Sequence, residues 1–476
     1  MKHMNRDKFY ISLRLLLVVM AGLALGSCSK SFVDKSPAGN LSTGEALSTP
    51  QLLQTDLIGL YSELRNVDQY GRDFPVIGDL MADNTFLEAR NSGRYTYQFA
   101  YTVPTIDAVT LSMWQESYNG ILDANQIIDA QVTGADAIKS QAYAIRALLY
   151  FKLVNIFAQP YTLDSTGMGV PLVLHYDVTA EPGRSSVAAV YKQIVSDLQT
   201  ALVSAPDYVN SVFLSRYAIE GLLARAYMYM GDYNDAFNAA KDVIMNSPFT
   251  LVQPGAFKAF WADPNVHTDA IEVMFEIDCD AINNNGFDDL GGIYINGYQD
   301  IYCSSQLQQL YSATDVRAEL LIYGLTKGQA PAYLVNKYPN AENTDKDNPK
   351  VIRLAEVYLI AAESAARLGD NLNGQGLLNA LATLRDPDPA FTGYTDVGAA
   401  LVADIIQERR KELAFEGDRL YDMQRCGLDI NRGTNSGAAS GDGISIPFPN
   451  DLRVAPIPEQ EILRNTTIAT QQNPGY

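Results

Sequence analysis

The sequence predicts a mostly α-helical protein, in which paired helices form a scaffold interrupted by long loops with short strands. Apolar residues recur at three- to four-residue spacing in several segments, as expected of helices with one buried face. Alternation of apolar and polar residues, the pattern of a strand, is confined to short segments. With 476 residues and ordinary apolar content, the chain is long enough for one large or two ordinary domains.

Residues 214–248 contain the clearest helical pair. The first helix gathers apolar residues on one face: Leu214, Ala218, Leu222, Ala226 and Tyr229. A turn at Gly231 leads to Asp232, a good cap for the second helix. The order of small, aromatic and proline positions is tetratricopeptide-like, although Glu220 and Ala240 stand where Trp and Phe are usual. Because one hairpin cannot bury both faces, partner helices must lie elsewhere in the chain.

The same spacing predicts further helices over 51–65, 113–129, 141–157, 187–201, 351–368, 377–384 and 402–424. Residues 272–278 alternate like a strand, and the aromatic residues within 95–101 alternate too. The long polar insertions between helical pairs indicate function, since repeat scaffolds rarely carry such loops otherwise. We divide the chain into an N-terminal part over 51–250, a loop-rich insertion over 251–350 and a C-terminal part over 351–476.

The first 28 residues have the features of an export signal. Lys2, Arg6 and Lys8 precede an apolar run, and the sequence then reads Leu25-Gly-Ser-Cys28. This ending resembles a bacterial lipobox, in which cleavage leaves a lipid-modified Cys28 as the first residue. We therefore expect a signal peptide over 1–27, a mature chain over 28–476 that begins with a tether over 28–50, and a protein anchored to a membrane rather than spanning it. An ordinary secretory signal is the alternative.

Charge and cysteine content exclude several classes of partner. The net charge is −20, and residues 1–27 carry +3, so the remainder carries −23, which argues against nucleic acid as a partner. Besides Cys28 there are Cys279, Cys303 and Cys426, which allow one disulfide, for example Cys279–Cys303, and one thiol. Few histidines and no CxxC pair argue against zinc or iron.

Two acidic segments raise the questions of metal binding and of catalysis. Residues 283–289 superficially resemble a calcium loop, but they lack its alternating acids and terminal Glu, so a plain turn is favoured and calcium is left open. In 407–427, Glu412 and Glu416 could act as an acid and a base, but the interleaved arginines favour an ion-pair network. No catalytic signature occurs in the chain, so we expect no enzyme and no cofactor.

A series of motifs runs through the mature chain in a recognisable order. They are Cys28 to Pro37, Tyr118 to Asp129, Arg146 to Phe151, Leu223 to Ala236, Ile352 to Glu363, Glu408 to Asp422 and Gln472 to Tyr476. Together they resemble the SusD/RagB family of outer-membrane nutrient-binding lipoproteins. The resemblance implies a SusD-like α/α superhelix, whose tetratricopeptide-like hairpins form a right-handed scaffold with long loop and short-strand insertions.

The resemblance also implies a function and partners. The protein would be a lid on a SusC-like TonB-dependent barrel, would bind an oligosaccharide, and would be anchored through Cys28 in the outer membrane of a Gram-negative bacterium, facing outward. Its ligand face would be built by loops 73–101 and 283–302. Aromatic and amide side chains suit sugars, so the expected ligand-binding residues are Asp83, Asn84, Tyr95, Tyr97, Tyr101, Asn285, Phe287, Tyr294 and Tyr298. Oligopeptide binding, a glycoside hydrolase and a purely structural adaptor are the alternatives.

Overall fold

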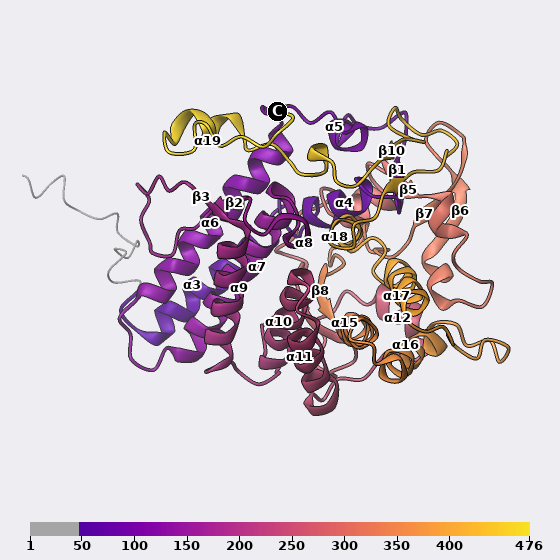
Figure 1. The fold of residues 1–476 in the computed structure, drawn as a ribbon, viewed down its shortest axis with the longest axis horizontal. Helices are drawn as coiled ribbons and strands as arrows, with labels where there is room; N and C mark the ends of the chain where they lie inside the picture. Colours follow the sequence, from indigo (N-terminus) through magenta and orange to yellow (C-terminus); the bar gives the residue numbers. More distant parts are fainter. Residues whose placement is uncertain (1–46) are drawn as a thin grey trace, which may run out of the picture.

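The computed structural model describes residues 47–476, and this part of the chain is mostly helical (Figure 1). The predicted signal peptide over 1–27, Cys28 and most of the tether over 28–50 lie outside the described residues. The helices are α3 (Pro50–Glu63), α4 (Asp73–Leu80), α5 (Thr96–Ala100), α6 (Ala108–Asp129), α7 (Asp136–Phe157), α8 (Tyr161–Asp164), α9 (Val187–Leu202), α10 (Arg216–Met230), α11 (Tyr233–Asn246), α12 (Phe257–Ala262), α13 (Leu290–Tyr294), α14 (Ser305–Gln308), α15 (Leu354–Arg367), α16 (Asn371–Arg385), α17 (Ala399–Glu412), α18 (Arg419–Arg425) and α19 (Glu459–Arg464).

The remaining regular elements are short. The 3₁₀ turns are η2 (Pro254–Ala256), η3 (Val316–Leu320) and η4 (Asp451–Arg453). The strands are β1 (Thr85–Leu87), β2 (Met168–Pro171), β3 (Arg184–Ser186), β4 (Val273–Glu276), β5 (Ile301–Cys303), β6 (Leu321–Leu325), β7 (Pro331–Val335), β8 (Lys350–Arg353), β9 (Ile430–Asn431) and β10 (Ser445–Ile446). Within residues 47–476, no helix has the length and apolar character needed to cross a membrane.

The helices pack in succession into a curved scaffold. Helix α6 contacts α7, α7 contacts α9, α9 contacts α10, α10 contacts α11, α11 contacts α15, and α15 contacts both α16 and α17. In Figure 1 this series runs from the left to the lower right, and strands β1, β5, β6 and β7 lie above its right-hand part. The prediction of a mostly α scaffold of helical hairpins with loop and strand insertions is confirmed.

The hairpin of α10 and α11 shows how the sequence builds each repeat. Ser215 caps α10 through a hydrogen bond from the Ala218 amide, and Gly231 ends the helix with a φ of 76°. Asp232 then caps α11. A Cβ on Gly221 would lie 2.7 Å from Ile352 Cδ1, so this glycine lets α10 approach β8 closely.

Three sequence-based assignments of secondary structure are wrong. Residues 351–353 belong to β8, which pairs with β4, so the helix predicted over 351–368 begins only at Leu354. The helix predicted over 402–424 is broken between α17 and α18, where Gly417 takes a φ of 88° against the backbone of Pro75. The aromatic alternation over 95–101 reflects the short helix α5 rather than a strand.

A four-stranded sheet joins distant parts of the chain. Its order is β1-β5-β7-β6, and all its pairs are antiparallel. Strand β1 pairs with β5 so that Phe86 lies opposite Tyr302, and their rings stack with centroids 5.7 Å apart. The sheet therefore connects the predicted N-terminal part to the predicted insertion.

Buried ion pairs connect the C-terminal helices to the rest of the core. Arg353 contacts Glu272, Glu412 and Glu416, and Arg385 contacts Glu272 and Glu412. All five side chains are buried. The interpretation of 407–427 as an ion-pair network that locks its helices to their neighbours is confirmed.

The three cysteines of the described chain are free thiols. Cys279 and Cys303 are buried and Cys426 is partly buried. No disulfide joins Cys279 and Cys303 in this structure. Both are buried, where a free cysteine packs as a small apolar side chain.

Candidate functional site

The two loop segments expected to form a ligand face lie side by side. The pairing of β1 with β5 joins them at one end. Beyond the strands, the Ser92 amide donates to the Asp300 carboxylate at 3.0 Å, and Lys327 Nζ donates to the same carboxylate at 2.6 Å. Residues 73–101 and 283–302 thus lie against each other, and we call the exposed and partly exposed residues of these two segments the loop face.

Arg94 connects the two segments at the surface. Its guanidinium carbon lies 3.7 Å from the centre of the Tyr298 ring, a close cation–π contact. Its Nη2 atom lies 3.3 Å from Asp288 Oδ1, an oxygen that also accepts a hydrogen bond from Arg72 at 2.8 Å. The Arg94 side chain is 31% exposed, so the loop face offers a flat, positively charged group beside an aromatic ring.

A groove of about 640 Å³ opens beside Arg94. It is lined by residues 92–98 on one side and by residues 104 and 106–109 on the other. Tyr97 is 50% exposed and Ile106 is 72% exposed, so the groove has an aromatic wall and an aliphatic rim that face solvent. Its volume falls within the range of about 300–1,000 Å³ typical of small-molecule sites.

Four of the nine residues expected to bind ligand reach the surface. Tyr97 and Phe287 are exposed, at 50% and 53%, and Tyr298 and Asn285 are partly exposed. Phe287 lies against Gly297, next to Tyr298 in sequence. The Asn285 amide donates to the Arg65 carbonyl at 2.7 Å and so fixes the loop to the end of α3. Ligand contact by these four residues stays a prediction.

Asp83 and Asn84, both expected to bind ligand, are buried in this structure, and ligand contact by them stays a prediction. Arg419 Nε lies 2.8 Å from the Asp83 carboxylate, and Asn84 donates to Asp79 at 2.6 Å while accepting from Arg410 at 2.9 Å. Although burial opposes ionisation, the arginines outweigh it and lower the pKa of Asp83. Both side chains hold loop 73–101 to the C-terminal helices.

Three further expected residues are also buried: Tyr95, Tyr101 and Tyr294. Each of them contacts another part of the chain through its hydroxyl or its ring. The Tyr95 hydroxyl contacts Asp73, and the Tyr101 hydroxyl donates to the Met81 carbonyl. Tyr294 stacks with Tyr338, at 6.1 Å between ring centres. Burial raises the pKa of Tyr101 to about 12, so this phenol stays protonated as a donor. These three rings are therefore buried in this structure, and ligand contact by them stays a prediction.

Sequence reasoning missed Arg94 and Ile106. A signal for Arg94 was present, since it is a cation beside Gly93 and Tyr95 in a polar loop. Nothing in the sequence distinguished Ile106 from a core aliphatic residue, and only the groove shows its position.

The turn at 283–289 is held by its own polar groups. The Asp280 carboxylate accepts from the amides of Ile282 and Asn283, both at 2.7 Å, and Asn284 accepts from the Gly286 amide at 2.9 Å. Among residues 47–476, no cluster of three or more His, Cys, Asp or Glu side chains has the arrangement of a metal site. These side chains therefore cap the turn.

The carboxylates considered for catalysis are buried ion-pair partners. Burial alone would raise the pKa of Glu412, but Arg385, Arg353 and Arg317 hold this pKa well below its ordinary value. Burial would also raise the pKa of Glu416, but Arg353 and Lys337 lower this pKa below its ordinary value. A carboxylate locked in this way has no proton to donate near neutral pH and no access to solvent.

Family models match both halves of the chain. A family described as "Starch-binding associating with outer membrane" matches residues 31–228, and the SusD family matches residues 313–476. The SusD-like protein P2 of Formosa agariphila is 25% identical over 98% of this chain and 100% of that protein. A SusD-like protein of Bacteroides ovatus is 22% identical over 87% of this chain and 83% of that protein.

Solved structures show the same architecture. A SusD superfamily protein from Bacteroides thetaiotaomicron superposes with a TM-score of 0.83 at 28% identity, covering 90% of this chain and 100% of that one. A putative sugar binding protein from Bacteroides vulgatus has a TM-score of 0.81 at 28% identity, covering 90% and 99%. A laminarin binding SusD-like protein shares the fold, with a TM-score of 0.72 at 22% identity, covering 90% and 100%. By its motifs, its family matches and its fold, this chain belongs to the SusD/RagB family.

Proposed function

We propose that the protein is a cell-surface lipoprotein that binds an oligosaccharide on the loop face, without catalysis. The observation that carries this proposal is the groove of about 640 Å³ in which the exposed Tyr97 stands beside Arg94. The names of two structural relatives, a putative sugar binding protein and a laminarin binding protein, support the ligand class.

The exposed groups of the loop face suit a sugar chain. The rings of Tyr97, Phe287 and Tyr298 offer apolar faces on which pyranose rings stack. Arg94 donates from Nη1 to Ser92 and from Nη2 to Asp288, which leaves further N–H donors for hydroxyl or carboxylate oxygens. This cation favours neutral or acidic sugars over basic ones.

The proposed cellular role follows from the family and from the start of the sequence. Removal of residues 1–27 would leave a lipid on Cys28, and the mature chain over 28–476 would be held at the outer membrane, facing outward. There it would act as the lid of a SusC-like TonB-dependent barrel and deliver captured glycan to it. The family description, which associates its members with the outer membrane, supports this location. Metabolic labelling with a palmitate analogue tests the anchor, because Cys28→Ala should abolish the label.

Isothermal titration of the purified chain against a panel of glycans tests the binding function. Tyr97→Ala should weaken binding of the preferred glycan at least tenfold, about 1.4 kcal/mol, the order expected for loss of a stacking ring. Tyr323→Ala is the matched control, since Tyr323 is 67% exposed on β6 and does not line the groove. Binding unchanged by Tyr97→Ala, or no heat with any glycan, would refute the proposal.

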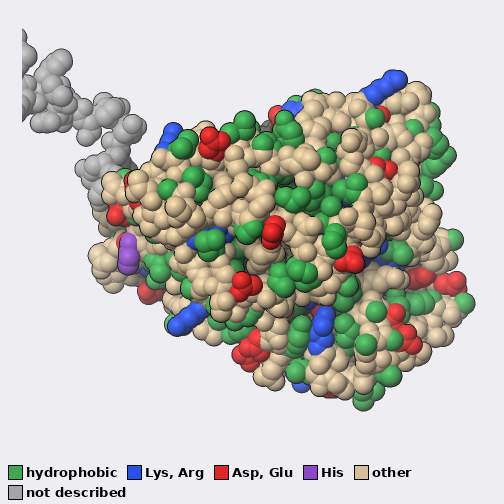
Figure 2. Space-filling model, turned by 45° about the horizontal axis from the view of Figure 1, so that its top comes forward, with side chains coloured by type: hydrophobic (Ala, Val, Ile, Leu, Met, Phe, Trp, Pro, Cys, Tyr) green, Lys and Arg blue, Asp and Glu red, His purple; other side chains and the backbone are tan. Residues whose placement is uncertain are grey.

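Oligopeptide capture is the second candidate, favoured by the acidic mature chain. A charge of −23 would attract cationic peptides at long range, and Asp and Glu side chains are scattered over the face shown in Figure 2. Mass spectrometry of ligand that copurifies with the chain from its own cells distinguishes the two, since peptides and sugars differ in mass pattern.

A further inference from the structure

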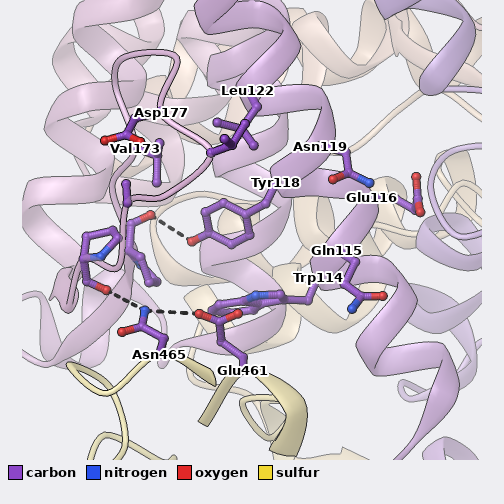
Figure 3. Close-up of a pocket in the computed structure, with 14 residues that line it drawn as sticks. Trp114, Gln115, Glu116, Tyr118, Asn119, Leu122, Val173, Asp177, Glu461 and Asn465 are labelled. Atoms are coloured by element: carbon purple, nitrogen blue, oxygen red, sulfur yellow. Dashed lines mark hydrogen bonds between the residues drawn. The ribbon is translucent and has the colours of Figure 1, made fainter. Parts of the chain in front are cut away.

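A second cavity, of about 400 Å³, lies away from the groove beside Arg94. Helix α6, the loop 172–183 that joins β2 to β3, and α19 enclose it (Figure 3). The two cavities share no lining residue. We call this cavity the Trp114 pocket, and its lining comprises Trp114, Gln115, Glu116, Tyr118, Asn119, Leu122, Pro171, Val173, Asp177, Val178, Ala180, Pro182, Glu461 and Asn465.

The walls of the pocket are fixed at both ends of loop 172–183. Near its start, the Asn125 side chain donates to the carbonyls of Val173 and His175, at 2.9 and 3.2 Å. Near its end, Asn465 on the segment after α19 donates to the Pro182 carbonyl at 3.0 Å. These hydrogen bonds hold the cavity open in advance, which reduces the entropy that a ligand would lose on ordering it.

The floor of the pocket is aromatic. The Trp114 ring packs edge-on against Phe157 at 4.9 Å and lies 5.0 Å from the Tyr118 ring, so its orientation is set by the core. The Tyr118 hydroxyl donates to the Pro171 carbonyl at 2.8 Å and is turned toward loop 172–183 in Figure 3. The two rings are tilted by 47° to each other and Trp114 is only 3% exposed, so the partly exposed Tyr118 ring offers most of the aromatic surface for a sugar ring.

Polar groups around this floor lack protein partners. Within residues 47–476, neither the Trp114 indole N–H nor the side-chain amides of Gln115 and Asn119 form a hydrogen bond. The Trp114 side chain is 3% exposed, but its indole N–H, unlike that of Trp261, is not buried without a partner and is accessible to water at the pocket. Gln115 is partly exposed and Asn119 is exposed, so a ligand with hydroxyl groups would replace water at these polar groups.

The charge of the lining selects among such ligands. Glu116, Asp177 and Glu461 line the pocket, and the lining holds no Lys or Arg. Their carboxylates are held in place by hydrogen bonds from Asn66, the Thr179 amide and Asn465. An anionic ligand would meet like charge here, whereas the loop face presents Arg94.

We propose that the Trp114 pocket is a second sugar site, which takes one neutral or amine-bearing pyranose ring and rejects acidic ones. The ligand class rests on the proposed glycan-binding function, but the position and the charge preference do not. Opposite preferences at two sites would let the protein hold one heterogeneous glycan at two places.

The two tryptophans of the chain make this proposal directly measurable. Trp114 lines the pocket, and Trp261 is buried among Phe257, Phe260 and Tyr338. Labelling with 5-fluorotryptophan therefore gives two ¹⁹F resonances, assigned by Trp261→Phe or Trp114→Phe. Titration with methyl glucoside or methyl glucosaminide should shift the Trp114 resonance in a saturable way and leave that of Trp261 in place. Methyl glucuronide should shift the Trp114 resonance at least tenfold more weakly, at equal concentration.

Variants separate this site from the loop face. Leu122→Phe narrows the pocket and should remove the Trp114 response, whereas Leu163→Phe on α8, outside the lining, should keep it. Tyr97→Ala should also keep it, and loss of the response there would place the ligand elsewhere and overturn the proposal. A Trp114 resonance that no sugar moves, or that the glucuronide moves equally, would overturn it as well. A saturable Trp114 response in a protein whose loop face binds nothing would overturn the proposed function alone.

Discussion

Arg385, at the end of α16, holds together two glutamates that would otherwise repel each other. Its buried guanidinium donates to both oxygens of Glu272, at 2.9 and 2.8 Å, and to both oxygens of Glu412, at 3.0 and 3.2 Å. A further hydrogen bond reaches the Val252 carbonyl at 3.1 Å. Arg385→Met keeps much of the apolar stem but removes the charge and all of these bonds.

The loss in the free energy of unfolding can be estimated from the ion pairs that remain in Arg385→Met. Arg353 still contacts Glu272 at 2.5 Å and Glu412 at 3.0 Å, and Arg317 still contacts Glu412 at 3.1 Å, so Glu272 would keep one guanidinium and Glu412 two. Breaking a buried ion pair costs about 3–5 kcal/mol, and we expect this range for Arg385→Met. An unfolding entropy of about 2.1 cal/mol/K per residue over residues 47–476 gives about 0.9 kcal/mol/K, so the Tm should fall by about 3–6 °C.

Differential scanning calorimetry of the purified variants measures this loss. Arg385→Lys, which keeps the charge but not the paired geometry, should lose less. Adding Glu272→Gln to Arg385→Met should recover part of the Tm, because it removes a buried carboxylate that has lost one of its two arginine partners. If the double variant recovers nothing, uncompensated charge is not the cause, and a Tm for Arg385→Met within about 1 °C of the parent would refute the reasoning altogether.

Three further perturbations test the scaffold. Leu222→Asp places a carboxylate in the buried face of α10 and should prevent folding, which circular dichroism would show as loss of the cooperative transition; a folded variant would contradict the packing. Burial and a hydrogen bond with Asp123 raise the pKa of Glu63 to about 9, so the folded state holds a proton that the unfolded state loses from about pH 4.5. This contribution to stability is complete below that pH and is lost as the pH rises toward 9. Glu63→Gln should therefore flatten the fall of Tm between pH 5 and 9. An unchanged pH profile would show that Glu63 and Asp123 are not the cause of that fall. Gly417→Ala should lower the Tm, since its Cβ would lie 2.4 Å from the Pro75 backbone. Gly376→Ala, with open space around it in α16, should leave the Tm unchanged or raise it, because the free energy of unfolding rises by up to about 1 kcal/mol. Equal effects of the two variants would argue against the clash at Gly417.

The local sequence pattern predicts most of the scaffold, because a long helix with one apolar face shows apolar residues at three- to four-residue spacing. Residues 141–157 and 187–201 were placed within a few residues of α7 and α9 for this reason. The break between α17 and α18 was missed because it depends on a neighbour, the Pro75 backbone, that lies far away in the sequence. β8 was missed for the same reason, since Val351 to Arg353 are strand only where β4 pairs with them.

The sequence predicts which two segments form the loop face, but not which of their side chains reach the surface. Tyr95 and Tyr97 are two positions apart in the same polar loop, yet one is buried and the other is 50% exposed. What decides between them is the contact of the Tyr95 hydroxyl with Asp73 and Arg72, which no local pattern encodes. Composition can propose that a loop carries ligand, but distant hydrogen bonds select which of its rings face solvent.

The pairing of β1 with β5 has a consequence for the order in which the molecule is made. Phe86 and its partner Tyr302 are 216 positions apart, 86 to 302, so at about 5–20 residues per second a ribosome needs roughly 10–45 s to supply the second strand after the first. Until then β1 has an unpaired edge and Arg94 has no Tyr298 ring to lie against. The surface proposed to meet the ligand is thus completed late in synthesis, after the first helical hairpins have already emerged.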